Sequence, residues 1–344
     1  MGKVLLTGAT GYIGAHILED LVKKGFDIVS TVRNRTKADW LRQLHPNAPI
    51  EFAYVDSITE DGAFDRVFSD HNDIEYVIHA ASPVGPPKND PVKDSLDPAM
   101  KGTGGILKSV LNYGSMVRHV VVTSSFAAVK NSYNVNSQDT LSEKSWNPIT
   151  FEDAVKDTTK TYAGSKTLAE KIVWEFVDQY KPNFSVTTIL PGFCLGPLIH
   201  PIFSPDGLTS PKPVYMMLHL DADSTDRPEP KMLRGCIDVR DVALAHVRAI
   251  ERPKESAGKR WFLVSQWLHT QQVLDIVNRR FPELKGKVAV GKPFAEGEFE
   301  SLLAQYPKLD TTATRAQSGI QFHPLEESIV DTVKSLIQLE KQWN

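Results

Sequence analysis

The chain has 344 residues, of which 41% are hydrophobic and 24% are charged, and its formal net charge is −3. This length is sufficient for a complete hydrophobic core in one large domain or in two lobes. The small net charge suggests neither a nucleic-acid partner nor a membrane surface, and no apolar run reaches the length of a transmembrane helix. Because Cys194 and Cys236 are the only cysteines and the start is not signal-like, we expect reduced thiols and a cytoplasmic protein.

The chain begins with a pattern typical of a strand, a glycine-rich turn and a helix. The apolar run Val4–Leu6 leads into Thr7–Gly14, after which apolar residues recur at helical spacing. Gly8, Gly11 and Gly14 permit a tight turn, a close approach of ligand to backbone, and close packing of helix on strand. Backbone N–H groups at the start of such a helix favour an anion. We therefore predict a diphosphate site here, against the alternative of an ordinary strand–helix turn.

Apolar strands alternate with helical patterns through the first half of the chain. This alternation predicts a parallel sheet covered by helices on both faces and joined by right-handed crossovers. Ligands of such sheets bind beyond the carboxyl ends of the strands. We expect an α/β, doubly wound, Rossmann-type fold with seven strands: Val4–Leu6, Phe26–Val32, Ile50–Val55, Tyr76–His79, His119–Ser124, Ser185–Leu190 and Trp261–Val264.

The composition changes after Leu190. Residues 191–230 are rich in proline and include a polar run, so we expect a poor sheet segment that helps to cover the substrate. A helical pattern returns at Asp238–Ile250, Thr270 is expected to cap another helix, and the tail ends in an amphipathic helix. We predict a Rossmann domain formed by residues 1–192 and 236–265, and a discontinuous substrate-binding lobe formed by residues 193–235 and 266–344.

The end of the second predicted strand distinguishes between two dinucleotides. About 20 residues beyond the glycines, where NAD enzymes usually carry Asp or Glu, this chain has Arg33. Arg33 can stack on adenine and contact a 2′-phosphate, and Lys37 adds a positive charge. We predict NADPH as the cofactor, with a solvated basic loop as the alternative. After the third strand, Asp56 and Ser57 either meet the adenine edge or form a simple strand-end turn.

The segment Tyr162–Lys166 carries the main chemical signal. It opens a helical run, so Tyr162 and Lys166 lie on one face with Cβ atoms about 5–6 Å apart. Free tyrosine has a pKa of about 10, and we expect the Lys166 ammonium, together with a nicotinamide cation, to favour the phenolate. Lys166 would also bind the nicotinamide ribose. The same spacing arises by chance with about even odds in a chain of this size, so the pair alone is weak evidence.

Ser125 strengthens this interpretation. It follows the predicted strand His119–Ser124, at the edge of the sheet where ligands bind. Its hydroxyl can donate a hydrogen bond to a substrate carbonyl oxygen, where negative charge grows as a hydride arrives. Tyr162 then delivers the proton as a general acid, and the cofactor supplies the hydride. The alternative for Ser125 is a hydroxyl that only caps the local backbone.

Together these motifs resemble the extended short-chain dehydrogenase/reductases. The chain looks most like the fungal NADPH-dependent aldehyde and ketone reductases that include methylglyoxal reductase, which are related to plant dihydroflavonol and cinnamoyl-CoA reductases. The resemblance runs nearly end to end through Gly8–Gly14, His79–Pro83, Thr123–Ser125, Tyr162–Lys166, Pro191–Pro197 and Ile237–Ala243.

The resemblance implies three sets of functional residues. The catalytic set is Ser125, Tyr162 and Lys166. The substrate pocket is walled by Val84, Phe126 and Phe193. The NADPH contacts are Gly8, Ala9, Thr10, Gly11, Tyr12, Ile13, Arg33, Lys37, Asp56, Ser57, Ala80, Tyr162, Lys166 and Cys194.

One position departs from the pattern of this family. Many relatives place an Asn three residues before a Gly-Thr pair, as part of a proton relay, whereas Gly102-Thr103 is preceded at that spacing by Ala99. The relay through Asn is therefore in doubt, and ordered water could replace it.

Other polar residues favour structural interpretations. We expect His79 to be a packed strand-end histidine that supports the cofactor turn. Asp238 and Asp241 are expected to form an ion-pair turn with the nearby Arg240 and Arg234 rather than a carboxylate dyad. The two cysteines lack the spacing of a metal or redox site.

The leading functional expectation is an oxidoreductase that uses NADPH to reduce a small or medium aldehyde or ketone. Methylglyoxal, aliphatic aldehydes and prochiral ketones are candidate substrates, and Met216 and Met217 would add to an adaptable apolar pocket. One alternative is a sugar-nucleotide epimerase or dehydratase that retains NAD, which Arg33 disfavours. Another is a non-catalytic NADPH sensor, which the intact triad disfavours. We expect a monomer or homodimer with no nucleic-acid or membrane partner.

Overall fold

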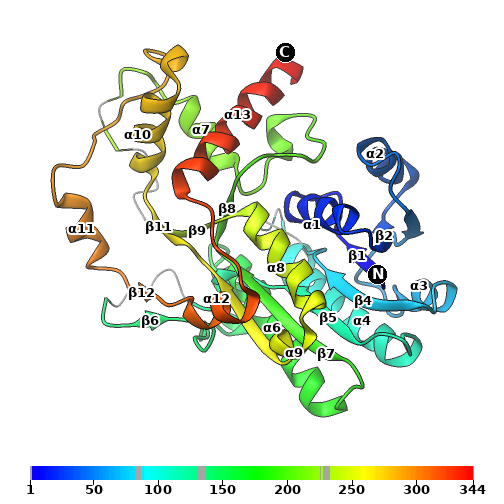
Figure 1. Ribbon diagram of the computed structural model, residues 1–344. Coiled ribbons are helices and arrows are strands. Elements are labelled where there is room, and N and C mark those ends of the chain that lie inside the picture. Colours follow the sequence, from blue (N-terminus) through cyan, green and yellow to red (C-terminus); the bar gives the residue numbers. More distant parts are fainter. Residues whose placement is uncertain are drawn as a thin grey trace.

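The computed structural model describes residues 2–82, 87, 89–130, 137–224, 226–227 and 233–343. Its central feature is a seven-stranded sheet with the order β10-β7-β5-β4-β1-β2-β3, in which all neighbouring strands are parallel (Figure 1). The predicted fold class and all seven predicted strands are confirmed, with ends shifted by a few residues. The strands are β1 (Lys3–Thr7), β2 (Asp27–Val32), β3 (Ile50–Tyr54), β4 (Ile74–His79), β5 (His119–Thr123), β7 (Ser185–Pro191) and β10 (Lys259–Leu263).

Successive residues of each strand contribute to two different cores. Val4 and Leu6 of β1 pack in one cluster with helices α1, α2 and α8, whereas Leu5 packs with α3, α4 and α6. Because side chains alternate between the faces of a sheet, a continuous apolar run marks a strand that is buried on both sides. The helices are α1 (Tyr12–Lys23), α2 (Arg35–Leu44), α3 (Asp65–Asp70), α4 (Asp97–Tyr113), α6 (Thr161–Tyr180) and α8 (Val239–Glu251).

A smaller second part lies beyond the carboxyl ends of β7 and of the edge strand β10. A three-stranded sheet with the order β11-β9-β8 lies there, because β8 follows β7 and β11 follows β10 after very short connections. Helices α7, α10 and α13 pack with β8 around a third apolar cluster (Figure 1). These elements are β8 (Phe193–Leu195), β9 (Arg234–Asp238), β11 (Gln266–Leu268), α7 (Lys212–Leu218), α10 (Thr270–Arg280) and α13 (Leu325–Trp343).

Short elements complete the described chain. Strands β6 and β12 form a two-stranded parallel sheet. One turn of π-helix precedes α4, and three 3₁₀ turns lie elsewhere. The remaining bounds are β6 (Thr140–Leu141), β12 (Lys308–Leu309), α5 (Phe151–Lys156), α9 (Pro253–Ser256), α11 (Glu298–Leu303), α12 (Thr312–Ser318), the π-helix Val92–Leu96, and the 3₁₀ turns Phe126–Ala128, Pro205–Gly207 and Pro282–Leu284.

Two details of the second part differ from the predictions. The segment after β7 was expected to be a poor sheet former, yet β8 pairs with β9 and aligns Phe193 with Cys236. A three-residue strand is stabilised by its neighbours rather than by its own pattern. Helix α10 begins at Thr270, but its cap is His269, whose Nδ1 accepts a hydrogen bond from the Gln271 N–H at 2.9 Å. The predicted helices that became α8 and α13 are confirmed.

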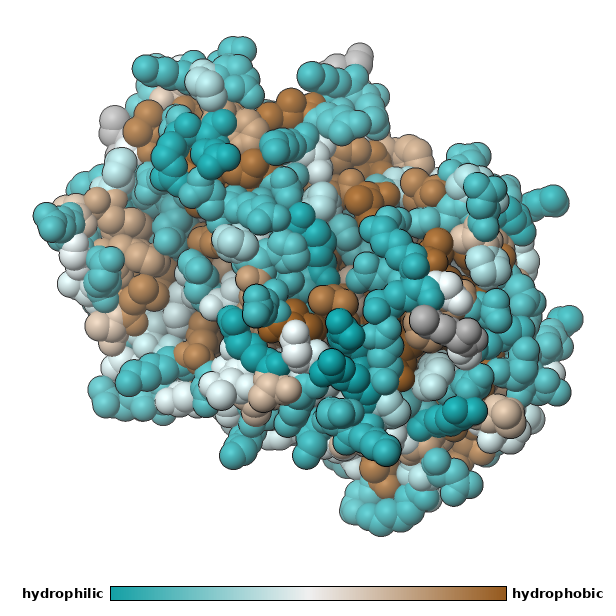
Figure 2. Space-filling view, in the orientation of Figure 1, coloured by the Kyte–Doolittle hydropathy of each residue, from teal (hydrophilic) through white to brown (hydrophobic). Residues whose placement is uncertain are grey.

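The outer surface is mixed in character. Figure 2 shows hydrophilic residues over most of one face, with hydrophobic residues gathered in separate areas. Within the described ranges, no helix combines the length and the apolar character needed to cross a membrane.

Candidate active site

The glycine-rich turn between β1 and α1 forms an open cradle. Gly8 has a φ of +79°, and a Cβ there would lie 2.8 Å from backbone atoms of Ala80 and Ala81. A Cβ at Gly14 would lie 2.0 Å from the Gly8 carbonyl oxygen, so no side chain fits there. Gly11 is exposed, and a Cβ there would meet the same oxygen at an ordinary 3.4 Å. The fold itself thus requires Gly8 and Gly14, whereas the space above Gly11 is open to a ligand.

Backbone donors at the start of α1 remain available in this cradle. The cap residue, Gly11, provides no side-chain hydrogen bond, and the first N–H groups of the helix, at Tyr12 and Ile13, have no intrahelical acceptor. The Tyr12 hydroxyl donates to the Gly196 carbonyl at 2.9 Å, so Tyr12 can meet a ligand only through its backbone. Ala9 is fully buried and Thr10 is half-buried. Uncapped donors at the positive end of a helix fit a diphosphate.

His79 supports this turn from below. Its Nδ1 lies 2.9 Å from the Thr7 hydroxyl, which also accepts a hydrogen bond from the Ala81 N–H at 3.1 Å. Burial, together with the charge of Lys166, lowers the pKa of His79 to about 3, so the ring is neutral. The neighbouring Ala80 is half-buried, and its N–H donates to the Thr7 carbonyl at 3.3 Å. The structural interpretation of His79 agrees with these contacts.

Two cations stand together at the end of β2. Arg33 is exposed, and Lys37 lies in the first turn of α2 with its Nζ 3.7 Å from the centroid of the Trp40 ring. Asn34 caps the helix by accepting a hydrogen bond from the Lys37 N–H at 3.1 Å. Burial and then the charge of Arg33 lower the pKa of Lys37. Neither cation has an ion-pair partner in the part of the chain that the structure describes, so the pair fits an anion such as a 2′-phosphate.

The predicted adenine contacts lie on the next strand end. Asp56 is exposed after β3, which neighbours β2 in the sheet. The Ser57 and Thr59 hydroxyls share a hydrogen bond of 2.7 Å, and the Ser57 hydroxyl also accepts from the Thr59 N–H at 3.3 Å. Ser57 therefore forms the local turn. It also lies at the same edge of the sheet as Arg33 and Lys37, because β3 neighbours β2.

The three predicted catalytic residues meet at the carboxyl end of β5. The Tyr162 hydroxyl donates to the Ser125 Oγ at 3.5 Å, and the Lys166 Nζ lies 5.9 Å from the centroid of the Tyr162 ring. The Ser125 Oγ also accepts from the Ala127 N–H at 3.1 Å, so Ser125 caps the local backbone and still keeps its own proton to donate. Lys166 is only 5% exposed, and among the described residues no acceptor pairs with its ammonium. A buried, unpaired ammonium fits hydroxyl groups such as those of a ribose.

Burial controls the protonation of this group. It raises the pKa of the Tyr162 phenol, an effect that the hydrogen bond with Ser125 partly offsets. It lowers the pKa of Lys166 to about 8. In the polypeptide by itself, desolvation of the phenol outweighs the hydrogen bond with Ser125, and the expectation that Lys166 and a nicotinamide cation together favour the phenolate stays a prediction. Tyr162 is protonated at neutral pH, which is the form that a general acid needs.

A family model described as the NAD dependent epimerase/dehydratase family matches residues 4–264. The chain belongs to this family. It is 36% identical over 345 residues to the NADPH-dependent methylglyoxal reductase of Saccharomyces cerevisiae, with 98% of this chain and 99% of that protein covered. It is 32% identical over 339 residues to a cinnamoyl-CoA reductase of Medicago truncatula, with 97% and 95% covered. The predicted resemblance to fungal and plant reductases is thus confirmed.

Solved structures agree with this assignment. The crystal structure of yeast methylglyoxal/isovaleraldehyde reductase complexed with NADPH matches with a TM-score of 0.89 at 33% identity, covering 99% of each chain. The likeness therefore includes both the sheet and the second part of this epimerase/dehydratase-family protein.

A buried ion pair that the sequence analysis missed holds α6, which carries Tyr162 and Lys166, to the sheet. Glu170 is 2% exposed and accepts hydrogen bonds from Arg260 Nε at 2.7 Å and Nη2 at 3.2 Å. It also accepts from the hydroxyls of Ser124 and Thr188, each at 2.7 Å. Because Ser124 precedes Ser125, and Glu170 lies one turn beyond Lys166, this network positions both halves of the predicted triad. The available signal was an acidic residue at helical spacing from Tyr162 and Lys166.

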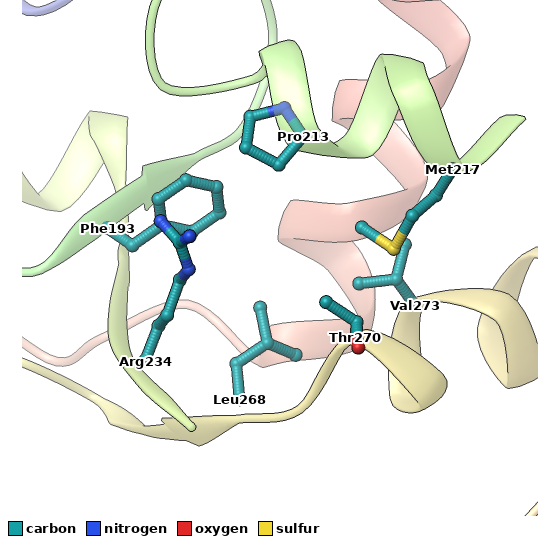
Figure 3. A pocket seen from close by; sticks show the side chains of 7 residues that line it. All are labelled: Phe193, Pro213, Met217, Arg234, Leu268, Thr270 and Val273. Carbon is teal, nitrogen blue, oxygen red and sulfur yellow. The ribbon is translucent and has the colours of Figure 1, made fainter. Parts of the chain in front are cut away.

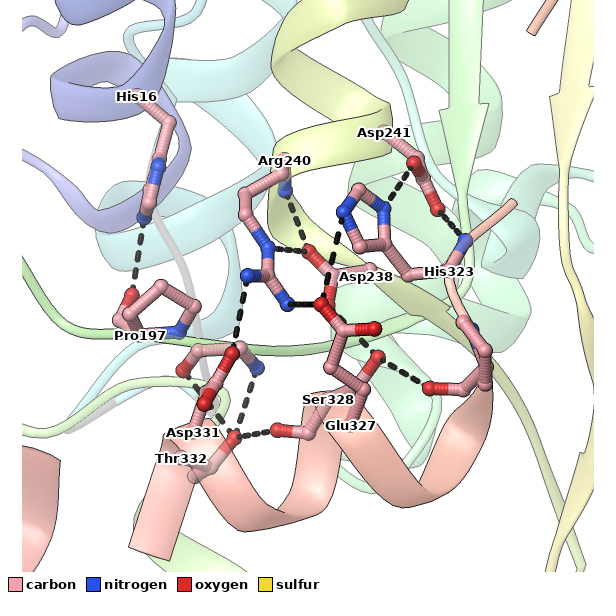
Figure 4. Close-up of polar contacts among 12 residues, drawn as sticks. His16, Pro197, Asp238, Arg240, Asp241, His323, Glu327, Ser328, Asp331 and Thr332 are labelled. Atoms are coloured by element: carbon pink, nitrogen blue, oxygen red, sulfur yellow. Dashed lines mark hydrogen bonds and ion pairs between the residues drawn. The ribbon is translucent and has the colours of Figure 1, made fainter. Parts of the chain in front are cut away.

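The acidic motif after β9 is structural (Figure 4). Arg240 donates to Asp238 from Nε at 2.9 Å and from Nη2 at 2.8 Å, and its Nη1 donates to Asp331 of α13 at 2.9 Å. Asp241 instead accepts from the His323 backbone N–H at 2.8 Å and lies 2.6 Å from His323 Nδ1. The predicted ion-pair turn is present for Asp238 and Arg240. The partner of Asp241 is a histidine from the last quarter of the chain, and these contacts fasten α8 to the C-terminal region.

A cleft lies beside Phe193 in the second part of the protein (Figure 3). Arg234 was expected to join the ion-pair turn, but it does not. Its guanidinium lies 5.4 Å from the centroid of the Phe193 ring. Phe126 packs against Phe262 and Trp267, with centroids 5.6 and 5.7 Å apart, and it does not line this cleft. The cleft is lined by Phe193, Pro213, Met217, Arg234, Leu268, Thr270 and Val273.

The remaining positions that the sequence analysis singled out are not among the described residues that line the cleft. Val84 lies outside the described residues, and Met216 is 60% exposed and is not among the residues that line the cleft. Ala99 is buried in α4, where a methyl group cannot relay a proton. Cys194 and Cys236 are buried on β8 and β9, and burial raises the pKa of both thiols. The described residues contain no cluster of three or more metal-binding side chains.

Proposed function

We propose that this protein is an NADPH-dependent carbonyl reductase that converts small or medium aldehydes and ketones to alcohols. The observation that carries the proposal is the convergence of the Ser125 and Tyr162 hydroxyls beside Lys166, at the strand edge that also holds the glycine cradle. End-to-end similarity to a yeast NADPH-dependent methylglyoxal reductase supports it. The test is the oxidation of NADPH by the purified protein with a panel containing methylglyoxal, aliphatic aldehydes and prochiral ketones.

Each part of the cofactor has a group of residues that fits it. The backbone from Gly8 to Ile13 would hold the diphosphate, and Arg33 and Lys37 would hold the 2′-phosphate. Lys166 would donate to the nicotinamide ribose, while Asp56 and Ser57 would meet the adenine. Ala80, Tyr162 and the segment at Cys194 would complete the contacts. NADPH, when bound, supplies the hydride.

The protein's own groups handle the carbonyl oxygen. Ser125 accepts hydrogen bonds from Ala127 and Tyr162 and so directs its proton toward a substrate. This donor stabilises the negative charge that grows on the oxygen during reduction. Tyr162, protonated because it is buried, transfers its proton to the same oxygen to give the alcohol.

We expect Arg33→Ala to reduce the preference for NADPH over NADH by roughly 10- to 100-fold, because a charged hydrogen-bond donor to the 2′-phosphate is lost. The measurement is the ratio of kcat/KM for the two cofactors. Arg42→Ala removes a charge farther along α2, where Arg42 pairs with Asp39, and should leave the ratio unchanged. Comparable kcat/KM for both cofactors in the wild type, or a retained preference in Arg33→Ala, would contradict the assignment.

We expect kcat/KM for NADPH to decline as the pH rises above about 8. Burial lowers the pKa of Lys166 to about 8, so its ammonium is present below that pH and is lost above it. The profile of kcat/KM reports groups of the free enzyme. Lys166→Arg, which stays charged at any accessible pH, should move the decline to higher pH. An unmoved decline in the active variant would assign it to another group.

The proposal also includes the organisation of the chain into lobes, its location and its oligomeric state. Residues 193–235 and 266–344 would form the substrate-binding lobe, because the cleft beside Phe193 is lined from these segments. The enzyme would work in the cytoplasm as a monomer or homodimer, without a membrane or nucleic-acid partner. Light scattering of the purified protein measures the oligomeric state.

A further inference from the structure

Among the described residues that line the cleft beside Phe193, Arg234 is the one charged side chain (Figure 3). Its guanidinium stacks near the Phe193 ring, while the other lining residues are apolar except for Thr270. In the described ranges, no carboxylate pairs with Arg234. By contrast, Arg240 and Arg260 both bind carboxylates directly. The donors of Arg234 are therefore available to a ligand that enters the cleft.

No carboxylate of the described residues forms an ion pair with Arg234. The protein around the guanidinium lowers its pKa by desolvation, although the residue keeps an exposed surface toward solvent. An arginine stays protonated at physiological pH, so this cleft carries a positive charge without a counter-ion from the described chain. An anionic group of a ligand would supply that counter-ion.

Backbone packing places β9, the strand that carries Arg234, beyond the carboxyl end of the central sheet, because β9 pairs with β8 and β8 closely follows β7. Gly235, the neighbour of Arg234, lies so close to Phe126 that a Cβ would be 3.1 Å from the phenyl ring, and Phe126 follows Ser125 directly. On the other side, a Cβ on Gly192 would be 2.4 Å from the Gly235 carbonyl oxygen. Both glycines allow β9 to approach the segments that follow β5 and β7. Arg234 therefore stands at the same end of the sheet as the hydroxyl of Ser125.

The chemistry of the cleft favours a carboxylate. A guanidinium matches a carboxylate with two parallel hydrogen bonds, and an apolar wall suits the carbon chain of the same molecule. A single arginine balances one negative charge, which a carboxylate carries and a phosphate ester exceeds.

We propose that the preferred substrates are oxo acids, whose carbonyl oxygen binds at Ser125 and Tyr162 and whose carboxylate binds Arg234. This inference rests on the proposed reductase function. In the reaction, the carbonyl carbon gains a hydride from NADPH, which becomes NADP⁺, and the π electrons of the C=O bond move to the oxygen. The oxygen takes the proton of Tyr162, and the product is a hydroxy acid with an unchanged carboxylate.

The test compares oxo acids of increasing chain length, each with its own methyl ester, as substrates with NADPH. At the chain length that spans the two sites, the acid should exceed its ester in kcat/KM by roughly 10- to 100-fold, as expected for a hydrogen bond between charged groups. Arg234→Gln should bring that ratio close to one, through KM more than kcat. Arg234→Lys should retain part of it. Arg66→Gln, which removes an exposed arginine on α3, should keep the wild-type ratio.

A binding measurement tests the site without turnover. Calorimetry with the enzyme–NADP⁺ complex should show that the hydroxy acid product binds wild-type protein more tightly than it binds Arg234→Gln, and that added salt weakens the difference. Circular dichroism spectra should establish that the variants are folded. An acid-to-ester ratio that is equal in wild type and Arg234→Gln at every chain length would overturn the proposal.

The outcomes separate the substrate inference from the reductase function. If methylglyoxal is reduced but no oxo acid is preferred, the inference about Arg234 is wrong and the reductase function stands. If no carbonyl compound oxidises NADPH, the reductase function itself is wrong. A phosphorylated ketone or a sugar nucleotide that is preferred over every oxo acid, with the preference lost in Arg234→Gln, would replace the carboxylate by a phosphate.

Discussion

Tyr162→Phe is expected to lower kcat by a factor of roughly 10² to 10⁴, because it removes the general acid while keeping the aromatic ring. The Tyr162 hydroxyl lies 3.5 Å from the Ser125 Oγ, and in the described part of the chain no other tyrosine hydroxyl forms a hydrogen bond with Ser125. Without the phenol, the carbonyl oxygen must take its proton from water. The measurement is steady-state NADPH oxidation with the best aldehyde of the panel.

Two controls make this result specific. Tyr180→Phe alters an exposed tyrosine at the end of the same helix and should leave kcat unchanged. The affinity of Tyr162→Phe for NADPH, followed by the fluorescence of the bound nucleotide, should change little, because Lys166 and the glycine cradle remain. Normal turnover in Tyr162→Phe would remove this residue from the mechanism.

Glu170→Ala is expected to lower the free energy of unfolding by about 3–5 kcal/mol, the cost of leaving a buried charge without its partner. Arg260 donates two hydrogen bonds to this carboxylate and also donates to the carbonyls of Glu143 and Ser145, at 2.8 and 2.6 Å. The guanidinium is therefore held in place and cannot turn to water when the carboxylate is lost. Urea unfolding followed by circular dichroism measures the change.

The matched control is Glu175→Gln, on the exposed face of the same helix, which should change the free energy of unfolding by less than about 0.5 kcal/mol. A double variant with Arg260→Met tests the pairing, because it should lose less stability than the sum of the two single variants. A loss of less than about 1 kcal/mol in Glu170→Ala would show that the ion pair does not stabilise the fold.

The sequence predicted the features that depend on local backbone preference. Apolar runs gave the seven strands of the sheet, and the glycines gave the turn after β1, where Gly14 has no room for a side chain. The i and i+4 spacing placed Tyr162 and Lys166 on one helix face. These features are encoded within a few residues, because the periodicity of side chains and the freedom of glycine act over that range.

Only the tertiary structure decided which distant charges meet and how burial changes them. Arg240, rather than Arg234, binds Asp238. His323 contacts Asp241, although the two residues are 82 positions apart in the sequence. Glu170 pairs with Arg260, which lies 90 residues away along the chain, and burial raises the pKa of Tyr162 in the polypeptide by itself. The physical reason is that electrostatic and desolvation energies depend on distance in space and on solvent access, and neither quantity is set by separation along the chain.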